Sequence, residues 1–436
     1  MDRRHWGLAA LMGGIHFTFH LFLRLIPPLI PVLAVVLGYP LWKLGLLVSG
    51  YFAGSSLFLL PMGVLSDRYD RRAVLSGALA VVGAGYVLLS FAPALGAGLP
   101  TTVVAGRHLD GPFAVMIAAT LVSGAGTSAH VPVGVPLLTS NASDEARGRI
   151  LGVWGGGSKL GDAAGPALVG VLVLAFGWRS ILLGFGVLGL VGGALLFVVL
   201  GATDLDTRPP TDRTGGEGTG AAEESWPTDR RRYLYPLLAL VGYFAAYNVV
   251  VQGAVTFVPT FVADVYGYTV TLGGLVVAPE SFADFALSVL LVAAAGGRFA
   301  GGALVDRYEH RRVLCGSLAV AAVAVLAFAV LPLGPGALVA VLVVLGVCLW
   351  GNSPARDSLV SDLTPDGREG RTFSYLWTAS RVFGALSPAA IGLLSETAGI
   401  RRSFSYLAAA TVVAALFVAL LFDDRVYVET GAATDD

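Results

Sequence analysis

The chain has 436 residues, of which 56% are hydrophobic and only 13% are charged, and its formal net charge is −1. Soluble domains carry about 25% charged residues, so this composition excludes an ordinary soluble protein as well as a basic nucleic-acid-binding one. The apolar runs are about 20 residues long, which is typical of membrane-spanning α-helices and not of the ~10-residue strands of an outer-membrane barrel.

Apolar runs bounded by charged residues, proline or glycine predict twelve helices. The first run follows "MDRRHWGLAA" and is too long and too polar for a cleaved signal peptide, so we expect it to be retained as a helix. Pro279 is expected to mark a break or a helix start, because 269–305 is too long for one straight span. The expected helices are 7–36, 41–65, 73–94, 113–138, 150–176, 180–201, 234–263, 280–305, 313–333, 336–357, 372–396 and 402–422.

A polar segment rich in glycine and proline, "TDLDTRPPTDRTGGEGTGAAEESWPTDRRR", divides the helices into six plus six and is typical of a flexible linker. Arginines concentrate on the side of the linker and the two termini, which predicts that this side is cytoplasmic. The expected domains are an N-terminal bundle over 1–201, a cytoplasmic linker over 202–232, a C-terminal bundle over 233–422 and a cytoplasmic tail over 423–436.

The two halves repeat each other. "GVLSDRYDRR" (63–72) recurs as "GALVDRYEHRR" (302–312), and 144–170 aligns with 366–392 at a constant offset of 222 residues. At this offset Lys159 matches Arg381. We therefore expect an all-α membrane protein with twelve transmembrane helices in two pseudo-symmetric six-helix bundles, and a substrate site between the bundles near the bilayer midplane.

With these repeats, the sequence resembles the major facilitator superfamily over essentially its full length. The family's loop between helices 2 and 3 has the pattern G-x-L-A-D-R-x-G-R-R, and here Asp70 replaces the second glycine. The resemblance implies that Asp67 meets the N-terminus of helix 11, and Asp306 that of helix 5, while the cytoplasmic side is closed. The implied gate residues, among which the glycines would allow close helix approach, are Gly63, Asp67, Arg68, Arg71, Arg72, Gly302, Asp306, Arg307, Arg311 and Arg312.

Helix 150–176 resembles the glycine-proline signature that this family shows in antiporters, although Val169 departs from the usual double glycine. The resemblance implies exchange of substrate for protons, while the alternative is ordinary helix packing by small residues. The residues of this pattern are Gly152, Gly161, Gly165, Pro166 and Gly170.

A narrower resemblance is to the fosmidomycin-resistance branch of the family. It rests on "HFTFH" with "LIPPLIPVLA" in the first helix and on "GAGTSAHVPVG" in the fourth, where Val131 separates His130 from Pro132. This resemblance covers mainly the N-terminal half.

Charged side chains inside the apolar runs are costly, at least ~2.5–3.5 kcal/mol each at the bilayer centre, so they usually face a cavity or a partner. His16, His20 and Arg24 share one helix face because they are spaced i, i+4, i+8. With Lys159, Arg381 and His130 they predict an anion-attracting chamber, because a guanidinium matches phosphate or carboxylate. The predicted substrate-binding residues are His16, His20, Arg24, His130, Lys159, Arg381, Tyr243, Tyr247, Asn248 and Gln252.

Alternatives remain for each of these groups. The histidines can bond neighbouring helices while Arg24 extends outward, and Arg381 can bind backbone carbonyls. The polar face of helix 7 (Tyr243, Tyr247, Asn248 and Gln252) can form interhelical hydrogen bonds instead of lining the cavity.

Carboxyl groups inside the helices are candidates for proton coupling. Asp162 is predicted to carry the proton, with Lys159 three residues before it as a partner; the alternative is a purely structural pair. Asp284 and Glu280 suggest either a second proton site or an exposed vestibule. Arg298 is expected to brace the loop at 302–312.

Metal-ligand spacings, nucleotide-binding loops and nucleophile motifs are not recognisable, so we expect no metal, no cofactor and no enzyme activity. The sequence predicts a secondary transporter in the plasma membrane that exports a small organic anion or amphiphilic solute in exchange for protons. The alternatives are an importer of an anionic metabolite, a cation-exporting multidrug transporter, and a receptor built on the same fold. The expected partners are the lipid bilayer, a small and possibly anionic substrate, and protons, with no nucleic acid and a monomeric chain.

Overall fold

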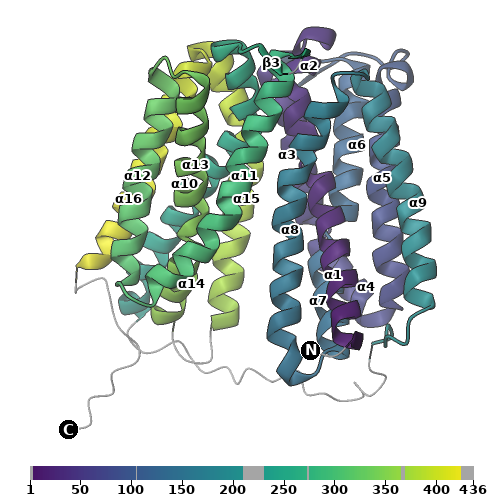
Figure 1. Ribbon diagram of the computed structural model, residues 1–436, viewed down its shortest axis with the longest axis vertical. Coiled ribbons are helices and arrows are strands. Elements are labelled where there is room, and N and C mark those ends of the chain that lie inside the picture. The colour runs from purple at the N-terminus through teal and green to yellow at the C-terminus, as the bar shows by residue number, and fades with distance from the viewer. Residues whose placement is uncertain (1–2, 105, 210–229, 273, 365–368, 424–436) are drawn as a thin grey trace.

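The computed structural model describes residues 3–104, 106–209, 230–272, 274–364 and 369–423 (Figure 1). Helices make up most of it. The N-terminal half contains α1 (Arg3–Leu23), α2 (Ile26–Leu37), α3 (Leu41–Leu57), α4 (Leu59–Arg68), α5 (Arg71–Leu95), α6 (Gly111–Thr127), α7 (His130–Asn141), α8 (Asp144–Leu172) and α9 (Trp178–Gly201). The C-terminal half contains α10 (Arg230–Phe261), the π-helix η1 (Val262–Tyr266), α11 (Pro279–Val305), α12 (His310–Val330), α13 (Pro335–Gly351), α14 (Ser353–Asp362), α15 (Glu369–Ala398), α16 (Ile400–Ala419) and the 3₁₀ turn η2 (Leu420–Phe422).

Four pairs of consecutive helices (α1/α2, α3/α4, α6/α7 and α13/α14) each form one interrupted span, so the helices make twelve spans, as the sequence predicts. Pro279 starts α11, which confirms the expected helix start. In the part of the chain that is described, ten spans are long and apolar enough to cross a membrane by themselves, and α8 and α15 are not among them. These two helices carry the polar residues Lys159, Asp162 and Arg381.

Proline interrupts the first span. In a continuous helix the N–H of residue 27 would donate to the carbonyl of Leu23, and Pro27 has no N–H. The chain makes a tighter turn there, in which Leu25 N–H donates to the Phe22 carbonyl at 3.3 Å. The Tyr86 hydroxyl of α5 donates to the same carbonyl at 2.5 Å. The turn places the side chain of Arg24 beside the polar part of α8 that is described below.

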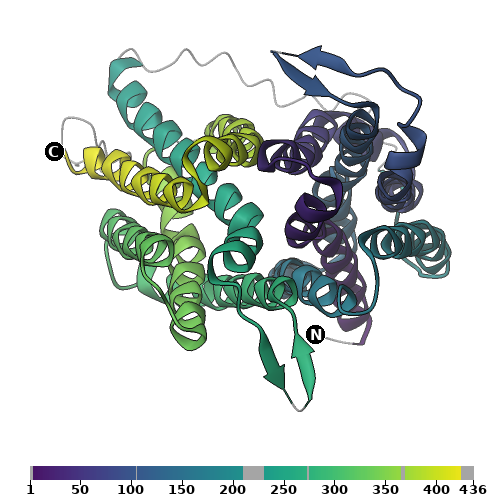
Figure 2. The ribbon, with the colours of Figure 1, turned by 90° about the horizontal axis from the view of Figure 1, so that it is seen from above.

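The spans form two bundles side by side, one from each half of the sequence (Figures 1 and 2). At one end of the molecule, which we call the linker end, α1 begins, α9 ends and α10 begins (Figure 1). At the opposite hairpin end, β1 (Thr102–Val104) pairs with β2 (Arg107–Leu109) and β3 (Val270–Leu272) pairs with β4 (Leu275–Val277), both antiparallel.

The two hairpins were not predicted from the sequence. Each turn contains a glycine with positive φ, Gly106 (74°) and Gly274 (88°), a backbone conformation that glycine adopts readily. The flanking "TVV" and "VTL" are rich in β-branched residues. A turn glycine flanked by β-branched residues is the sequence pattern from which the hairpins could have been predicted.

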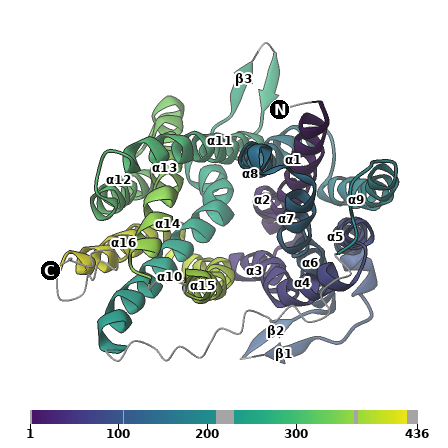
Figure 3. The same ribbon diagram turned by 90° about the horizontal axis from the view of Figure 1, so that it is seen from below.

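The bundles meet through two equivalent helix pairs, α8 with α11 and α3 with α15 (Figure 3). Gly170 of α8 lies against Asp284 and Ser281 of α11, and its repeat mate Gly392 of α15 lies against the backbone at Leu41 of α3. A Cβ at either glycine would overlap the opposite bundle. The repeat detected in the sequence is therefore also a repeat of the interface.

The cross-bundle hydrogen bonds lie at the same level. The Ser288 hydroxyl of α11 donates to the Ala163 carbonyl of α8, and Ala389 N–H of α15 donates to the Ser49 hydroxyl of α3 at 3.2 Å. These residues belong to the halves of their helices that lie towards the hairpin end, so the bundles are joined there.

The apolar core extends through both bundles. In the C-terminal bundle Phe261 packs against Phe328 and Phe404, with ring centroids 4.5 and 4.7 Å away. Large apolar side chains also face outward, for example Leu195 (60% exposed) and Val323 (69% exposed). Outward-facing apolar side chains on long apolar helices are what a lipid-facing surface requires.

Candidate functional site

The polar centre of the N-terminal bundle is Asp162 of α8, which is 1% exposed. Its carboxylate accepts hydrogen bonds from Arg24 Nε at 2.8 Å, His20 Nδ1 at 3.0 Å and Lys159 Nζ at 3.0 Å. The expected Lys159–Asp162 pair is confirmed, and α1 supplies two further partners. Arg24 is 7% exposed, so the alternative in which it extends outward is wrong.

Close helix packing makes this network possible. A Cβ at Gly161 would overlap the Phe17 carbonyl of α1, and one at Gly165 would lie 2.9 Å from the Arg24 Cβ. With Gly170 at the bundle interface and Pro166 buried in α8, these positions agree with the expected packing role. Gly152 does not: a Cβ there would meet nothing within 4 Å, because this part of α8 borders a cavity.

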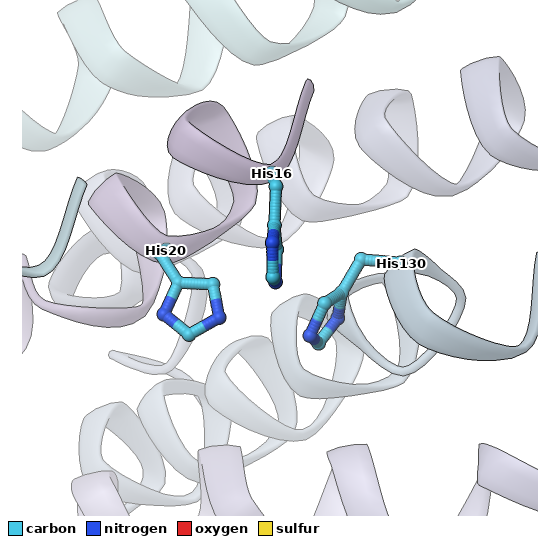
Figure 4. Close-up of side chains that lie close together, drawn as sticks. All are labelled: His16, His20 and His130. Carbon is cyan, nitrogen blue, oxygen red and sulfur yellow. The ribbon is translucent and has the colours of Figure 1, made fainter. Parts of the chain in front are cut away.

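Three histidines converge beside Asp162 (Figure 4). His16 and His20 come from α1 and His130 from the first residue of α7. His16 stacks on Trp154 of α8, with ring centroids 4.0 Å apart, and its Nδ1 donates to the Trp154 carbonyl at 2.8 Å. The sequence predicted that His16 and His20 share a face and that His130 belongs to the same chamber, and the structure brings the three rings together. One ring nitrogen from each lies within 4.8 Å of the others, a spacing that suits a metal ion.

A cavity of about 490 Å³ lies between α8 and α11 on the linker side. Lys159 and Arg298 line it from opposite bundles, together with Gly152, Gly155 and Phe299. The Lys159 ammonium has three donors and Asp162 takes one of them, so donors remain for a ligand. Arg298 is exposed in this cavity, and the expectation that it braces the loop at 302–312 is wrong in this conformation.

Arg381 of α15 is the charge that the C-terminal bundle brings towards the histidines, and it interacts electrostatically with His130. It forms neither a hydrogen bond nor an ion pair with any described residue, which contradicts the alternative that it binds backbone carbonyls. Its expected role in substrate binding stays a prediction.

The polar face of α10 packs largely inside its own bundle. Tyr243 and Tyr247 are 0% and 4% exposed, and the Tyr247 hydroxyl donates to the Leu349 carbonyl of α13 at 2.6 Å. The Asn248 amide donates to the Phe244 carbonyl at 2.9 Å and to the Ser380 hydroxyl of α15. The expectation that Tyr243 and Tyr247 line the cavity is therefore wrong here, because they fill the space between helices. Gln252 lies beside Gly384 of α15, and its Oε1 is buried with no partner in the described part of the chain.

Two buried polar residues, Asn352 and Asp284, lie outside the predicted substrate-binding set. Asn352, between α13 and α14, is 0% exposed, and neither polar atom of its side chain has a hydrogen-bond partner among the described residues. It occupies the repeat position of His130 at the offset of 222, which was the signal in the sequence. Asp284 is also 0% exposed, with both carboxylate oxygens unpaired by any described group, so the suggested exposed vestibule is wrong for this residue.

The implied gate residues at the linker end do not join the bundles in this conformation. Arg71 is 6% exposed and donates to Ser140 of α7 at 3.3 Å, while the guanidinium of Arg72 lies 4.3 Å from the Phe197 ring of α9. Both contacts stay within the N-terminal bundle. Asp70 caps α5 by accepting from Arg72 N–H at 2.9 Å, so aspartate serves the turn where the family pattern has glycine.

The second copy of this loop behaves similarly. Glu309 pairs with Arg311 and lies 3.1 Å from Arg312, and Arg311 also donates to the Leu421 carbonyl at 2.8 Å. The paired acids and basic residues of each loop thus hold neighbouring helices of the same bundle together. The remaining loop residues are exposed: Asp67, Arg68, Asp306 and Arg307.

The expected close approach at the loop glycines is wrong here. A Cβ at Gly302 would meet nothing within 4 Å, and one at Gly63 would only reach Pro132 at 4.0 Å. Helices α11 and α13 instead approach at Gly301, one residue earlier, where a Cβ would overlap the Gly351 carbonyl. Gly63 and Gly302 therefore have free space on their side-chain faces.

A second charged cluster lies at the hairpin end. Asp110 caps α6 by accepting from Phe113 N–H at 2.9 Å, and it also accepts from Lys43 at 2.7 Å and Tyr39 at 2.6 Å. Partial burial raises the pKa of Asp110, but these three hydrogen bonds outweigh it and the net pKa is lowered from 3.8. Burial, followed by the adjoining Asp110, raises the pKa of Tyr39, which therefore remains a donor.

The geometry has a clear chemical meaning. A buried carboxylate fixes two cationic side chains and one imidazole on one wall, and Lys159 keeps free donors towards the space between the bundles. Arg298 and Arg381 add cationic groups from the other bundle. Such an arrangement can bind and release an anion without any covalent step.

Comparison with known proteins gives the same picture. The family model described as Major Facilitator Superfamily matches residues 12–282 and 278–435. The Methylenomycin A resistance protein of Streptomyces coelicolor is 30% identical over 165 residues, which cover 38% of this chain and only 31% of that protein. The Hexuronate transporter of Bacillus subtilis is 23% identical over 392 residues, covering 87% of this chain and 85% of the relative.

Among solved structures, a bacterial homologue of the human lysosomal transporter Spinster, in an inward-facing and unoccupied conformation, superposes with a TM-score of 0.76. It is 15% identical and the match covers 96% of this chain and 97% of that one, so this likeness concerns the fold. The family model spans both bundles. The chain therefore belongs to the major facilitator superfamily.

Proposed function

We propose that this protein is a secondary active transporter of the plasma membrane, which moves a small organic anion by alternating access and couples its movement to protons. The observation that carries the proposal is that cationic side chains from both bundles, Lys159 and Arg298, line one inter-bundle cavity, while a third, Arg381, interacts electrostatically with His130. An anion bound there would hold the two bundles together through both sets of charges.

The conformation fits one of the two end states of alternating access. Cross-bundle contacts lie in the half towards the hairpin end, while the cavity lies on the linker side. With the arginine-rich linker end placed in the cytoplasm by the positive-inside rule, the protein faces inward. In the opposite state the exposed Asp67 and Asp306 would close the linker end against the other bundle, as the loop signature implies.

We propose Asp284 as the carboxyl that carries the coupled proton. Asp162 was the candidate from the sequence and its role in proton transfer stays a prediction, but two cationic side chains and an imidazole already compensate its charge. Asp284 has no such partner within the described residues, and it lies against Gly170 of α8 at the bundle interface. An uncompensated buried charge is costly, so a neutral acid suits the closed interface and an ionised one suits the opened, hydrated interface.

The charged surroundings of Asp284 support this role. Glu280 lies one turn earlier on α11, and Asp264 lies on the adjoining η1. The facing parts of α8, α10 and α13, and the whole of α2, carry no charged residue in the sequence. Opening and closing the hairpin end would then change the hydration of Asp284 without exchanging one ion pair for another.

Export of the anion is the favoured direction, and import of an anionic metabolite is the second candidate. The name of the Streptomyces relative, a resistance protein, supports export. The name of the Bacillus relative, a hexuronate transporter, supports an anionic substrate and leaves import open.

Flux measurements in proteoliposomes test the proposal. With an imposed pH gradient, a panel of phosphonates, phosphates, carboxylates and one cationic dye is screened. We expect flux of at least one anion, reduced about tenfold or more by Lys159→Ala or Arg381→Ala, since a charged hydrogen bond contributes about 1.5–3 kcal/mol. Arg179→Ala is the matched control, because Arg179 lies on the rim of the hairpin end and contacts the ring of its neighbour Trp178. Transport of the dye alone, unaffected by either cavity variant, would refute the proposal.

A further inference from the structure

The three histidines described above form a compact group. The ring centroids of His16 and His20 are 4.6 Å apart, those of His16 and His130 5.3 Å, and those of His20 and His130 5.4 Å. In Figure 4 the rings point into one common space, two from α1 and one from α7. His20 keeps 17% of its side chain accessible, so the space is not sealed.

In each of these rings, Nδ1 forms a hydrogen bond to a partner outside the three-histidine group. Nδ1 of His16 donates to the Trp154 carbonyl at 2.8 Å, and Nδ1 of His130 donates to the Thr127 carbonyl at 2.5 Å. Nδ1 of His20 donates to the Asp162 carboxylate at 3.0 Å. A carbonyl or carboxylate partner requires the proton on Nδ1, so each neutral ring presents the lone pair of Nε2.

Three Nε2 lone pairs that share one space can coordinate a cation placed between them. Histidines that bind metals almost always donate their other N–H to a carboxylate or backbone carbonyl, which is the arrangement of all three rings here. Asp162, His20 and the common space form the carboxylate–histidine–metal sequence of such sites.

The dimensions agree with a tetrahedral ion. Metal–nitrogen bonds of roughly 2.0–2.1 Å and tetrahedral angles place imidazole centroids about 5 Å apart. The observed centroid separations lie between 4.6 and 5.4 Å. The ligand nitrogens lie within 4.8 Å of one another, whereas bonds of this length at tetrahedral angles require about 3.3 Å, so binding would draw the three side chains together.

We propose that His16, His20 and His130 bind one divalent transition-metal ion of the zinc, cobalt or nickel class, with a fourth position open to the cavity. Three imidazoles select these metals over magnesium or calcium, which prefer oxygen ligands. The site goes beyond the proposed anion transport and does not depend on it, because binding requires neither a gradient nor movement of the bundles.

A spectroscopic titration tests the site. The full chain is purified in detergent with an affinity tag free of histidine and is titrated with Co²⁺, whose visible absorption is much stronger in tetrahedral than in octahedral sites. We expect one Co²⁺ per chain with tetrahedral absorption, which one equivalent of Zn²⁺ removes. Octahedral absorption only, or no saturable binding, would overturn the proposal.

Variants assign the ligands. His20→Ala and His130→Ala are each expected to weaken Co²⁺ binding more than tenfold and to remove the tetrahedral bands. Asp162→Asn, which changes the partner of His20 as well as that of Arg24 and Lys159, is expected to weaken it about 10–100-fold. His108→Ala is the matched control, because His108 lies in β2 at the hairpin end. Unchanged binding in both histidine variants would overturn the assignment.

His16 is buried against Trp154, so His16→Ala can fail to fold for reasons of packing. His16→Gln keeps most of the volume and tests the same ligand, and the temperature of unfolding without metal confirms that it is folded. For the wild type, Zn²⁺ should raise the unfolding temperature, and it should do so much less in His16→Gln. Equal shifts in the two proteins would contradict the participation of His16. The Co²⁺ titration uses neither a gradient nor a substrate anion, so its outcome is read separately from the flux measurement that tests the proposed function.

Discussion

Arg24 and Asp162 are 138 positions apart in sequence and form a buried hydrogen-bonded ion pair, 2.8 Å long, between the first and fifth spans. Lys159 and His20 complete the same network from either helix. Removing one member of a buried charged network leaves the others uncompensated, which costs far more than breaking an exposed pair.

Asp162→Ala should therefore destabilise the protein strongly. It leaves Arg24 and Lys159 without their carboxylate, and we expect the free energy of unfolding to fall by about 3–5 kcal/mol. The measurement is the unfolding temperature in detergent, followed by intrinsic fluorescence. Asp144→Ala is the control, since Asp144 pairs with Arg147 at 2.8 Å but its side chain is 91% exposed. Equal unfolding temperatures in the two variants would contradict a stabilising role of the network.

Asp284→Asn should uncouple transport from protons. The amide has the shape of a neutral carboxyl group but cannot release a proton, so the closed interface with Gly170 should form normally. We expect exchange of labelled for unlabelled anion to continue in proteoliposomes while accumulation driven by a pH gradient is lost. Glu280→Gln, one turn away on α11, should retain both activities. Gradient-driven accumulation in Asp284→Asn would assign the proton to another group.

Gly170→Val should prevent the bundles from closing at the hairpin end. Its Cβ would lie 2.9 Å from the Asp284 Cβ and 3.2 Å from the Ser281 carbonyl, which is closer than ordinary contact. We expect a cysteine introduced at Ser281 to be labelled rapidly by a membrane-impermeant reagent in this background and slowly in an otherwise wild-type chain. Gly184→Val in α9 is the control, because a Cβ there meets nothing within 4 Å. Slow labelling in the Gly170 variant would show that the interface can adapt.

The Asp110 cluster should give the protein an acid-sensitive stability. The folded pKa of Asp110 lies below its usual 3.8, so its ionised form contributes stability that is present above the unfolded pKa and is lost as the pH falls through the lower folded value. Asp110→Asn removes this contribution. The unfolding temperatures of wild type and variant should therefore differ above about pH 4 and converge below it. A constant difference across this range would mean that the asparagine acts only through the helix cap.

Much of the fold could be predicted from the sequence, because apolar length and repetition are properties of the chain itself. The offset of 222 residues that relates Lys159 to Arg381 also relates Gly170 to Gly392, and both glycines lie at the bundle interface. The hairpins were missed because their strands of three residues are shorter than any useful hydropathy window.

The candidate site was only partly predictable. Helical spacing places His16, His20 and Arg24 on one face, but it does not give the rotation of α1 against α8 that brings His20 and Arg24 onto Asp162. His130 joins them only because the fourth span breaks before α7. For Tyr243 and Tyr247 the helical spacing was misleading. They share one face of α10, but that face packs inside its own bundle instead of lining a cavity.

The polarity of α8 has a consequence for biogenesis. In the described part of the chain α8 does not reach the hydropathy that lets the neighbouring helices enter a bilayer alone. Its Asp162 pairs with Lys159 of the same helix and with Arg24 of α1, which is synthesised well over a hundred residues earlier. The first span must therefore remain available beside the insertion machinery until the fifth emerges, so that the two enter the lipid as a pair. The ion network thus also makes insertion of the fifth span dependent on the first.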